Sequence, residues 1–450
     1  MTNIDNSWKL FRNLWELIPD NGKAFSHILV SLKTRNFRLY FGGMCISLIG
    51  TWMQQIAMSW LVYKLTGSVF LLATVTFMAQ IPILLVTPFM SVLVDRFDRR
   101  QILIVTQTLS MIQALILAVL TLTELIQVWH ILLLSLFIGC INALDNPTRQ
   151  AFYPGLVSKE NLSNAIALNS AVINGSRLIG PGIGGVLISV FGEGICFLLN
   201  GISYTGVIIA LLMMHLQTST PHRYTNNIMA DMHEGFSYVT GSIPIRSLLL
   251  LMSVISFFGL PLMTFIPAYV KDILSGGSEM LGGLLSSIGI GSFAAAIYLA
   301  ARKSVVGLGK VVTISGFLLG IGLGLLSFIE IPWIAALLCI PVGFAIISTV
   351  ASINTLLQTL SDEDKRGRVM GYLAMTFTGI APIGSLTLGA LEKYTGLPMI
   401  ILFSGIACIT GALIFEHYRP LVRRHARGIY IRKGIISEIA NGIEQTEEQF

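Results

Sequence analysis

The chain is dominated by long runs of apolar residues, each about 18–28 residues in length. About 20 apolar residues in a helix are enough to cross a hydrocarbon core of about 30 Å. Because lipid offers the backbone no hydrogen-bond partner, a run that crosses it alone is expected to be helical. The composition agrees, since 54% of the residues are hydrophobic and only 12% are charged. Soluble domains carry roughly 25% charged residues, so we expect an all-α, multi-pass membrane protein.

Twelve such runs can be delimited along the chain. The first six cover residues 39–62, 70–93, 101–122, 129–150, 162–190 and 194–215, and the second six cover 247–270, 280–300, 311–328, 333–360, 367–390 and 397–415. The polar stretch 216–246 separates them, so we expect two six-helix bundles around a central cavity, an arrangement of parallel-repeat transporters. The expected organisation is an N-terminal extension (1–37), a first bundle (38–215), a linker (216–246), a second bundle (247–417) and a basic tail (418–450).

The lysines and arginines predict the orientation. With the N-terminus in the cytoplasm, 25 of them fall on the cytoplasmic side and only Lys64, Lys271 and Lys393 on the other. Cytoplasmic loops are enriched in Lys and Arg. The chain is therefore expected in the inner membrane of a bacterium, with both termini in the cytoplasm.

The first 37 residues contain no apolar core of the kind found in a cleavable signal peptide. Their aromatic and aliphatic residues are spaced among basic residues, as in Trp8, Lys9, Phe11, Arg12 and Trp15. This spacing is typical of an amphipathic helix lying on a membrane surface. A cytoplasmic helix packed on the bundle is the alternative.

The loop between the second and third runs carries an ordered pattern of charges. It reads Ser91-Val-Leu-Val-Asp-Arg-Phe-Asp-Arg-Arg100 and resembles the loop signature Gly-x-Leu-Ala-Asp-Arg-x-Gly-Arg-Arg of the major facilitator superfamily, with Ser91 and Asp98 in place of the glycines. In that family the cluster latches the two halves together on the cytoplasmic side. The resemblance implies the same role here, although a plain basic loop would also satisfy the charge rule.

Two further segments narrow the resemblance. Asp145-Asn-Pro-Thr-Arg149 ends the fourth run, and Asp362-Glu-Asp-Lys-Arg-Gly-Arg368 precedes the eleventh. Both are similar to segments of the enterobactin-exporter-like and macrolide-efflux-like drug:proton antiporters. That similarity implies export of a siderophore or another medium-sized amphiphile. The latch is then expected to comprise Asp95, Arg96, Arg99, Arg100, Asp145, Arg149, Arg366 and Arg368.

The fifth run contains Gly180, Pro181, Gly184 and Gly185, which match the end of the antiporter signature of that superfamily. Small residues let helices approach closely in lipid, and proline frees a backbone carbonyl and permits bending. Two interpretations stay open, a flexible seam against the other half and close packing alone.

Arg177 is the one cation expected near the middle of a span. An arginine at that depth is costly and marks a functional site by default. Its planar guanidinium suits carboxylate or catecholate oxygens, so we expect it to contact an anionic substrate. A structural bond to helix carbonyls or to Asp145 is the alternative.

Other side chains are weaker candidates for the cavity, because each is more often a packing or interhelical hydrogen-bonding residue. They are Gln54, Gln55, Asn142, Asn174, Phe257, Phe258, Asn354 and Met375. Proton coupling is an open question, because Asp145 is the one carboxylate expected within the membrane.

Several functions are disfavoured by what the sequence lacks. It has no Gly-x-x-x-x-Gly-Lys-Ser/Thr loop for ATP and no His-Glu-x-x-His pair, and its five cysteines show no Cys-x-x-Cys spacing. We expect no enzyme activity, no cofactor or metal and no nucleic-acid partner. The expectation is a monomeric secondary transporter of a small molecule in the lipid bilayer. Multidrug or macrolide efflux, siderophore uptake, and a transport-inactive receptor or regulator are the alternatives.

Overall fold

The fold is that of a computed structural model, which describes residues 30–214, 228–302, 304–363 and 365–433. The side chains of residues 88, 89, 91–96 and 228–233 lie outside this description. The described part contains helices and no strand, and twelve of its helical segments are long and apolar enough to span a membrane. The predicted number of spans and the all-α class are therefore confirmed. The predicted amphipathic helix near the N-terminus lies outside the described residues.

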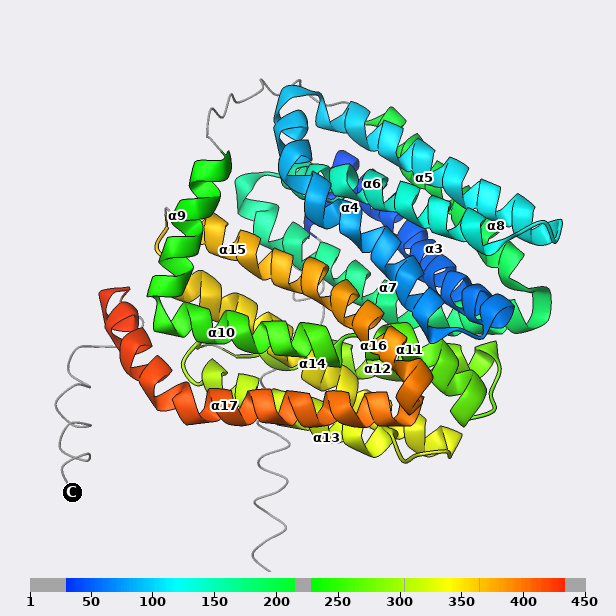
Figure 1. The fold of residues 1–450 in the computed structure, drawn as a ribbon. Helices are drawn as coiled ribbons and strands as arrows, with labels where there is room; N and C mark the ends of the chain where they lie inside the picture. The colour runs from blue at the N-terminus through cyan, green and yellow to red at the C-terminus, as the bar shows by residue number, and fades with distance from the viewer. Residues whose placement is uncertain (1–29, 215–227, 303, 364, 434–450) are drawn as a thin grey trace, which may run out of the picture.

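The first six spans are single helices. They are α3 (Arg35–Thr66), α4 (Val69–Arg96), α5 (Arg99–Leu122), α6 (Val128–Phe152), α7 (Leu162–Phe191) and α8 (Glu193–Met213). Short 3-10 turns, η1 (Val30–Lys33), η2 (Tyr153–Leu156) and η3 (Lys159–Asn161), flank α3 and connect α6 to α7. Figure 1 shows these helices in blue to green, packed side by side.

Two spans of the second half are interrupted. The seventh consists of α10 (Ile243–Val254), η4 (Ile255–Gly259), α11 (Leu262–Ala268) and η5 (Tyr269–Ile273), and the eleventh of α15 (Arg366–Met375), η6 (Thr376–Ile380) and α16 (Ala381–Thr395). The other four are α12 (Ser278–Ala300), α13 (Leu308–Leu326), α14 (Pro332–Leu360) and α17 (Leu397–Arg432). A further helix, α9 (Ile228–Gly241), lies within the predicted linker.

The interruptions η4, η5 and η6 are π-helical turns. Each is followed or preceded within two residues by a proline, namely Pro261, Pro267 and Pro382. Proline cannot donate to the carbonyl four residues earlier, and its ring clashes with that carbonyl. At η4 and η6, where the proline follows the turn, a wider turn relieves this conflict while the neighbouring residues still form hydrogen bonds, as Leu260 N–H does to the carbonyl of Ile255 at 3.0 Å. Single π turns within helices are frequent at functional sites.

The helix α17 is longer than the sequence indicated. Its apolar run was predicted to end at residue 415, but the helix continues to Arg432 through a strongly basic segment. Arg419 and Glu416, one turn apart, form an ion pair at 2.8 Å, and Lys433 caps the end of α14 by donating to the carbonyls of Thr359 and Ser361. The apolar run stops where the apolar residues stop, at residue 415. The helix continues beyond it because the basic segment still forms side-chain contacts.

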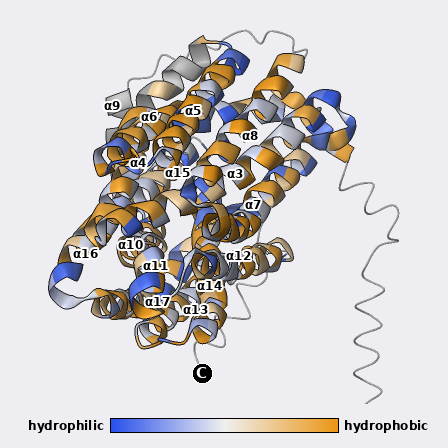
Figure 2. Cartoon of the chain, turned by 90° about the vertical axis from the view of Figure 1, so that its right-hand side faces the viewer, coloured by the Kyte–Doolittle hydropathy of each residue, from blue (hydrophilic) through white to orange (hydrophobic). Residues whose placement is uncertain are grey.

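Each half packs mainly within itself. In the first half α3 packs on α7 and α8, α4 on α6, and α5 on α6 and α8. In the second, α14 packs on α12 and α13, and α17 packs on α13 and α10. The halves meet chiefly through two helix pairs, α7 with α12 and α4 with α16 (Figure 1). The hydrophobic residues run along the helices, and many of the hydrophilic ones gather toward helix ends (Figure 2).

Several close contacts between the halves lie near one set of helix ends. Gly185 of α7 lies against Gly282 of α12, and Gly389 of α16 lies against Phe70 of α4. Tyr63, close to the end of α3, contacts Asp272 of η5. We call this the outer end, because it lies opposite the end that carries α9 and the basic end of α17.

Helices α12 and α14 cross at unusually small separation. A Cβ atom added to Gly291 would lie 1.8 Å from the carbonyl oxygen of Ile340, and one added to Gly343 would lie 2.0 Å from that of Ile288. Both obstacles are backbone atoms, so no side-chain rotation can make room. The second bundle therefore requires glycine at both positions.

We predict that Gly291→Ala lowers the thermal stability of the purified protein. Overpacking of a core costs about 1–3 kcal/mol, and here the helices themselves must separate. Gly283→Ala on the same helix is the matched control, because an added Cβ there meets no atom within 4 Å. The measurement is thermal unfolding in detergent, monitored by tryptophan fluorescence. Equal melting temperatures for the two variants would contradict the close crossing.

Candidate functional site

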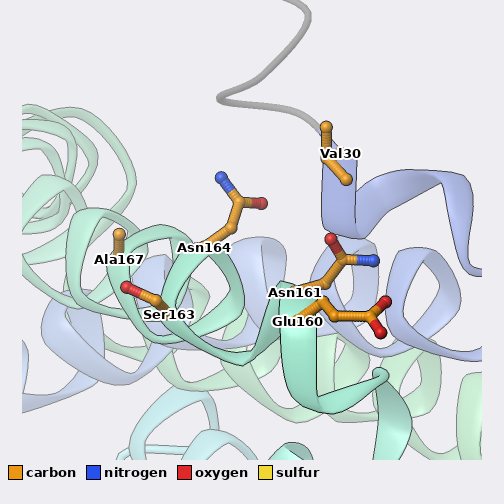
Figure 3. A pocket seen from close by; sticks show the side chains of 6 residues that line it. All are labelled: Val30, Glu160, Asn161, Ser163, Asn164 and Ala167. Carbon is orange, nitrogen blue, oxygen red and sulfur yellow. The ribbon is translucent and has the colours of Figure 1, made fainter.

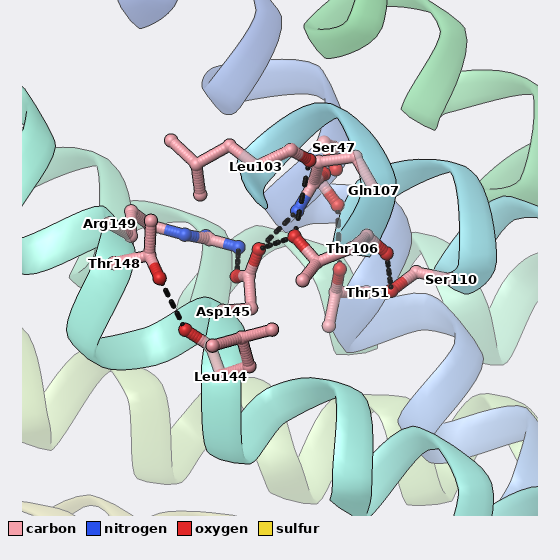
Figure 4. Close-up of polar contacts among 10 residues, drawn as sticks. All are labelled: Ser47, Thr51, Leu103, Thr106, Gln107, Ser110, Leu144, Asp145, Thr148 and Arg149. Carbon is pink, nitrogen blue, oxygen red and sulfur yellow. Dashed lines mark hydrogen bonds and ion pairs between the residues drawn. The ribbon is translucent and has the colours of Figure 1, made fainter. Parts of the chain in front are cut away.

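A buried polar network joins α5 and α6 of the first half near the end opposite the outer end. Asp145 of α6, whose side chain is 2% exposed, forms an ion pair with Arg149 one turn later. Its carboxylate also accepts hydrogen bonds from Thr106 Oγ1 at 2.7 Å and Gln107 Nε2 at 2.9 Å, both on α5 (Figure 4). A buried carboxylate with a cation and two further donors is compensated.

Of the arginines in the predicted latch, Arg149 pairs with Asp145 and Arg99 does not. Arg99 instead donates to the carbonyl of Ala151 at 3.1 Å. Arg100 donates to the carbonyls of Leu211 and Leu212 at 2.7 and 2.9 Å, at the end of α8. Both arginines thus cap the C-terminal ends of helices in their own half.

The rest of the predicted latch is divided between two places. Asp95 and Arg96 end α4, and their side chains lie outside the described part of the chain. Asp98, which replaces a glycine of the family pattern, caps α5 by accepting from the backbone N–H of Arg100 at 2.7 Å. Arg366 and Arg368 begin α15 in the other half.

Helix α9 contacts the start of α15 through charges. Glu234 pairs with Lys365 and with Arg368, the latter at 2.8 Å. The hydroxyl of Tyr238 donates to Asp362 at 3.0 Å. The hydrogen bond from Lys365 lowers the pKa of Glu234 below its ordinary value. Because the folded-state pKa is lowered, the pairing persists on acidification until the pH falls to that lower value. These contacts fasten part of the linker to the second half, and the sequence analysis missed Glu234.

A second polar chain connects α3, α5 and α8 inside the first half. The side chain of Asn200 donates to Gln54 at 2.8 Å, and Gln54 donates to Gln113 at 3.1 Å. All three residues are buried. Gln54 was predicted to line the cavity, but in the structure its side-chain amide forms hydrogen bonds with residues of two other helices. Gln113 and Asn200 were missed, although each is an isolated amide within an apolar run.

Arg177 occupies the midpoint of α7 and rests on an aromatic ring of α3. Its Cζ atom lies 5.1 Å from the centroid of Trp52, a cation–π distance. Its Nε atom is buried and has no hydrogen-bond partner, and the described residues include no carboxylate paired with this arginine.

Three polar residues of α7 lie on one face of the helix. Ser170, Asn174 and Arg177 follow each other at spacings of four and three, which places them on one helix face. Asn174 donates to the carbonyl of Ser170 at 2.9 Å. The exposed apolar residues Ile183 and Val190 lie on the opposite side by helical rotation. Arg177 therefore lies on the side of α7 opposite these two residues.

The glycine signature of α7 lies against two neighbouring helices, α3 and α12. A Cβ on Gly180 or Gly184 would collide with Trp52 or Ile56 of α3, in the same half. A Cβ on Gly185 would collide with the backbone of Ser278 and Gly282 of α12, in the other half. Pro181 is buried, and its carbonyl faces Gly282. The signature thus provides close packing within the half and also forms part of the contact between halves.

The remaining cavity candidates are scattered. Gln55 of α3 is exposed and Asn142 of α6 is half-buried. Asn354 accepts from Gln358 at 2.6 Å on α14. Phe257 and Phe258 pack edge to face within η4, with centroids 4.8 Å apart, and Met375 directly precedes η6.

A shallow hollow of about 410 Å³ opens at the start of α7 (Figure 3). It is lined by Val30, Glu160, Asn161, Ser163, Asn164 and Ala167. Beside it, the backbone of Ser31 donates to Asn164 at 3.1 Å and so anchors η1 on α7. The hollow contains none of the predicted site residues.

Twelve spans in two halves, and halves that meet through α7–α12 and α4–α16, define a secondary transporter of the major facilitator type. Residues 27–427 match the sequence model of a family described as "Transmembrane secretion effector", and the chain belongs to this family.

Curated relatives resemble most of the chain. The staphyloferrin A transporter of Staphylococcus aureus is 25% identical over 84% of this chain and 95% of its own length. The multidrug efflux pump Tap of Mycolicibacterium fortuitum is 24% identical over 76% and 85%. Macrolide efflux protein A of Streptococcus pyogenes is 23% identical over 85% and 96%. These relatives confirm the predicted transporter class and the likeness to efflux proteins.

Solved structures confirm the fold. A variant of the nucleoside transporter NupG superposes with a TM-score of 0.68 at 13% identity, covering 87% of this chain and 99% of that one. A bacterial homologue of the iron transporter ferroportin, in an inward-facing state, gives 0.66 at 16% identity, covering 85% and 98%.

We predict that Asp145→Asn destabilises the protein by about 3 kcal/mol, since removing one partner of a buried ion pair leaves the other charge uncompensated. Arg149→Gln is expected to cost less, because Thr106 and Gln107 still donate to the carboxylate that it leaves without its cation. The double variant should cost less than the sum of the two single variants. Melting temperatures of the four proteins give this cycle. Strict additivity would mean that the two side chains do not interact.

Proposed function

We propose that this transporter exports a siderophore or a similar medium-sized anionic amphiphile by alternating access. The observation that carries the proposal is Arg177, a cation at the middle of a span that stacks on Trp52 and has no carboxylate partner among the described residues. Placing arginine at this depth costs about 2.5–3.5 kcal/mol on insertion scales. An anionic substrate would offset that cost.

The structural alternative for Arg177 was a bond either to helix carbonyls or to Asp145. A bond to Asp145 is disfavoured because that carboxylate already pairs with Arg149 and accepts from two side chains of α5. Arg177 instead lies on the face of α7 that also carries Asn174 and Ser170, whose polar groups suit the hydrophilic part of an amphiphile.

The relatives favour the same substrate class without fixing it. One bears the name of staphyloferrin A, and others are named for multidrug or macrolide efflux. A cationic drug would be repelled by Arg177, so we favour the siderophore. Uptake is the alternative for direction, and a receptor or regulator without transport is the alternative for class.

The proposed arrangement is a monomer in the bacterial inner membrane, with both termini in the cytoplasm and no enzymatic activity. Residues 38–215 and 247–417 form the two bundles, 216–246 links them, and 1–37 and 418–450 extend from them. The basic residues of the α4–α5 turn and of α15 then lie at the cytoplasmic face. We propose that Asp95, Arg96, Arg99 and Arg100 latch this face to Arg366, Arg368 and their surroundings when the cavity opens outward.

The transport proposal is tested with Arg177 variants in proteoliposomes, with staphyloferrin A as the first probe. Affinity is expected to fall in the order wild type, Arg177→Lys, Arg177→Gln. The loss of a charge-assisted hydrogen bond of about 1.5–3 kcal/mol corresponds to a roughly tenfold to hundredfold weaker affinity for the glutamine variant. Arg302→Gln is the control, because Arg302 is a cation near the helix end that contacts Tyr298 and Val306.

Unchanged affinity in Arg177→Gln would remove the substrate role, and failure of both Arg177 variants to accumulate would make the residue structural. Profiling cells and medium after gene deletion, with and without iron, tests the direction. An exporter mutant should retain the molecule inside the cell. Loss of uptake instead would reverse the proposed direction.

Topology is tested by single-cysteine labelling in intact cells. With Cys45 and Cys140 replaced by alanine, cysteines at Lys64 and Lys393 should react with an impermeant maleimide from outside. Cysteines at Arg99 and Arg302 should react only after the cells are opened. The reverse pattern would place the outer end in the cytoplasm.

A further inference from the structure

The last part of α17 is a strongly basic helical segment that follows directly on a membrane span. The apolar part of the helix ends with Phe415, and residues 416–433 contain six arginines and lysines but a single acidic residue, Glu416. A cluster of about four to eight Lys and Arg immediately beyond a span is typical of a site for anionic lipid. A basic helix surrounded by water would have the same composition, so the position of the segment must be considered as well.

The basic segment stays close to the end of the second half. A helix that ran straight on would carry its last residues about 27 Å beyond Phe415. Figure 1 shows the red end of α17 turned aside from the direction of its orange part. Lys433 donates to the carbonyls of Thr359 and Ser361, at 2.8 and 2.7 Å, where α14 ends. The turn and this contact keep the basic residues near the place where the spans leave the membrane.

One face of the basic segment is buried against the rest of the protein. Val422, Ala426 and Tyr430 follow one another at spacings of four and are only 8, 4 and 9% exposed. Ala426 and Tyr430 belong to the main hydrophobic core cluster. Their burial fixes the rotation of the helix about its own axis, so the residues on the opposite face point outward.

The opposite face carries an exposed row of residues. Spacings of three, four and four place its members on one side of the helix, and each of them is exposed. We call this row the basic stripe, and it consists of Leu421, Arg424, Gly428 and Arg432. Neither of its arginines forms an ion pair among the described residues, whereas Arg419, on the other side of the helix, pairs with Glu416 at 2.8 Å.

We propose that the basic stripe binds the phosphate groups of anionic phospholipids at the end of the second half. A guanidinium group holds phosphate oxygens through two parallel N–H···O bonds, and Arg424 and Arg432 are open for this contact. Leu421 is 39% exposed and lies on the same face as Arg424. Helices that lie in the membrane interface combine basic and apolar residues in this way.

An acidic polypeptide is the other candidate for the basic stripe. Residues 434–450 of this chain contain four glutamates and neither lysine nor arginine. Lipid is favoured for two reasons. The stripe begins within two helical turns of Phe415, the last apolar residue of the span, and the exposed Leu421 suits an acyl chain better than a carboxylate.

The test needs no transported substrate, because the proposal does not depend on one. An environment-sensitive fluorophore is attached to a cysteine at Gly428, which lies between the two arginines and where an added Cβ meets no atom within 4 Å. Cys45 and Cys140 are replaced by alanine in this background, and the other cysteines are buried. The full-length protein in mild detergent is titrated with phosphatidylglycerol and, separately, with phosphatidylcholine. The emission of the fluorophore gives the apparent affinity for each lipid.

We expect a higher affinity for phosphatidylglycerol than for phosphatidylcholine. A basic residue close to an anionic surface contributes a factor of about five in affinity, so Arg424→Gln and Arg432→Gln should each weaken phosphatidylglycerol binding about fivefold and the double variant about 25-fold. Arg419→Gln is the matched control, because it removes the same charge from the same helix but on the side that pairs with Glu416. It should retain the wild-type affinity.

Three results would overturn the proposal. Equal affinities for the two lipids would exclude recognition of the phosphate charge. Wild-type affinity for phosphatidylglycerol in the double variant would exclude the two arginines. A response to phosphatidylglycerol that appears only after residues 434–450 are removed would assign the basic stripe to that acidic segment instead.

Discussion

The inability of lipid to hydrogen-bond with protein is the constraint on which this structure depends. It requires each span to satisfy its own backbone, which makes the spans helical. It also requires polar side chains to find partners inside the bundles. Asp145 meets this need with Arg149 and α5, and Gln54 meets it with Gln113 and Asn200. The same constraint makes the Nε of Arg177 informative, because among the described residues this atom has no hydrogen-bond partner and the guanidinium lies over the ring of Trp52.

The fold could be predicted from the sequence to the level of its twelve spans, because the length and hydropathy of a span are local properties. The bends could not. The π turns beside Pro261 and Pro382 were not predicted, because such turns depend on packing between spans, as of Gly384 against the backbone of Phe257. The extent of α17 was also missed, because the side-chain contacts of its basic segment leave no trace in hydropathy.

The candidate site was predictable in part, for a related reason. Arg177 could be selected because a mid-span charge is rare, but its neighbour Trp52 could not, since an aromatic residue in an apolar run carries no signal of its own. Tyr63 and Asp272 were overlooked for another reason. They are separated by 209 positions in the chain, and nothing in either local sequence indicates that the halves bring them together. Gln54 was selected as a weak cavity candidate, but its amide bonds to other helices. A polar residue at membrane depth can form interhelical hydrogen bonds as readily as it can contact a substrate.

The π turns have a consequence for how the second half can move. A π turn accommodates an additional residue within a helix, so its conversion to an α turn would rotate everything beyond it by about 100° and shift it by about 1.5 Å. In the seventh span such a change at η4 would turn α11 relative to α10, and in the eleventh a change at η6 would turn α16 relative to α15. Different side chains of α11 and α16 would then face the opposite half. Such a change would exchange the surface that the second half presents to the first, whereas the described spans of the first half contain no π turn.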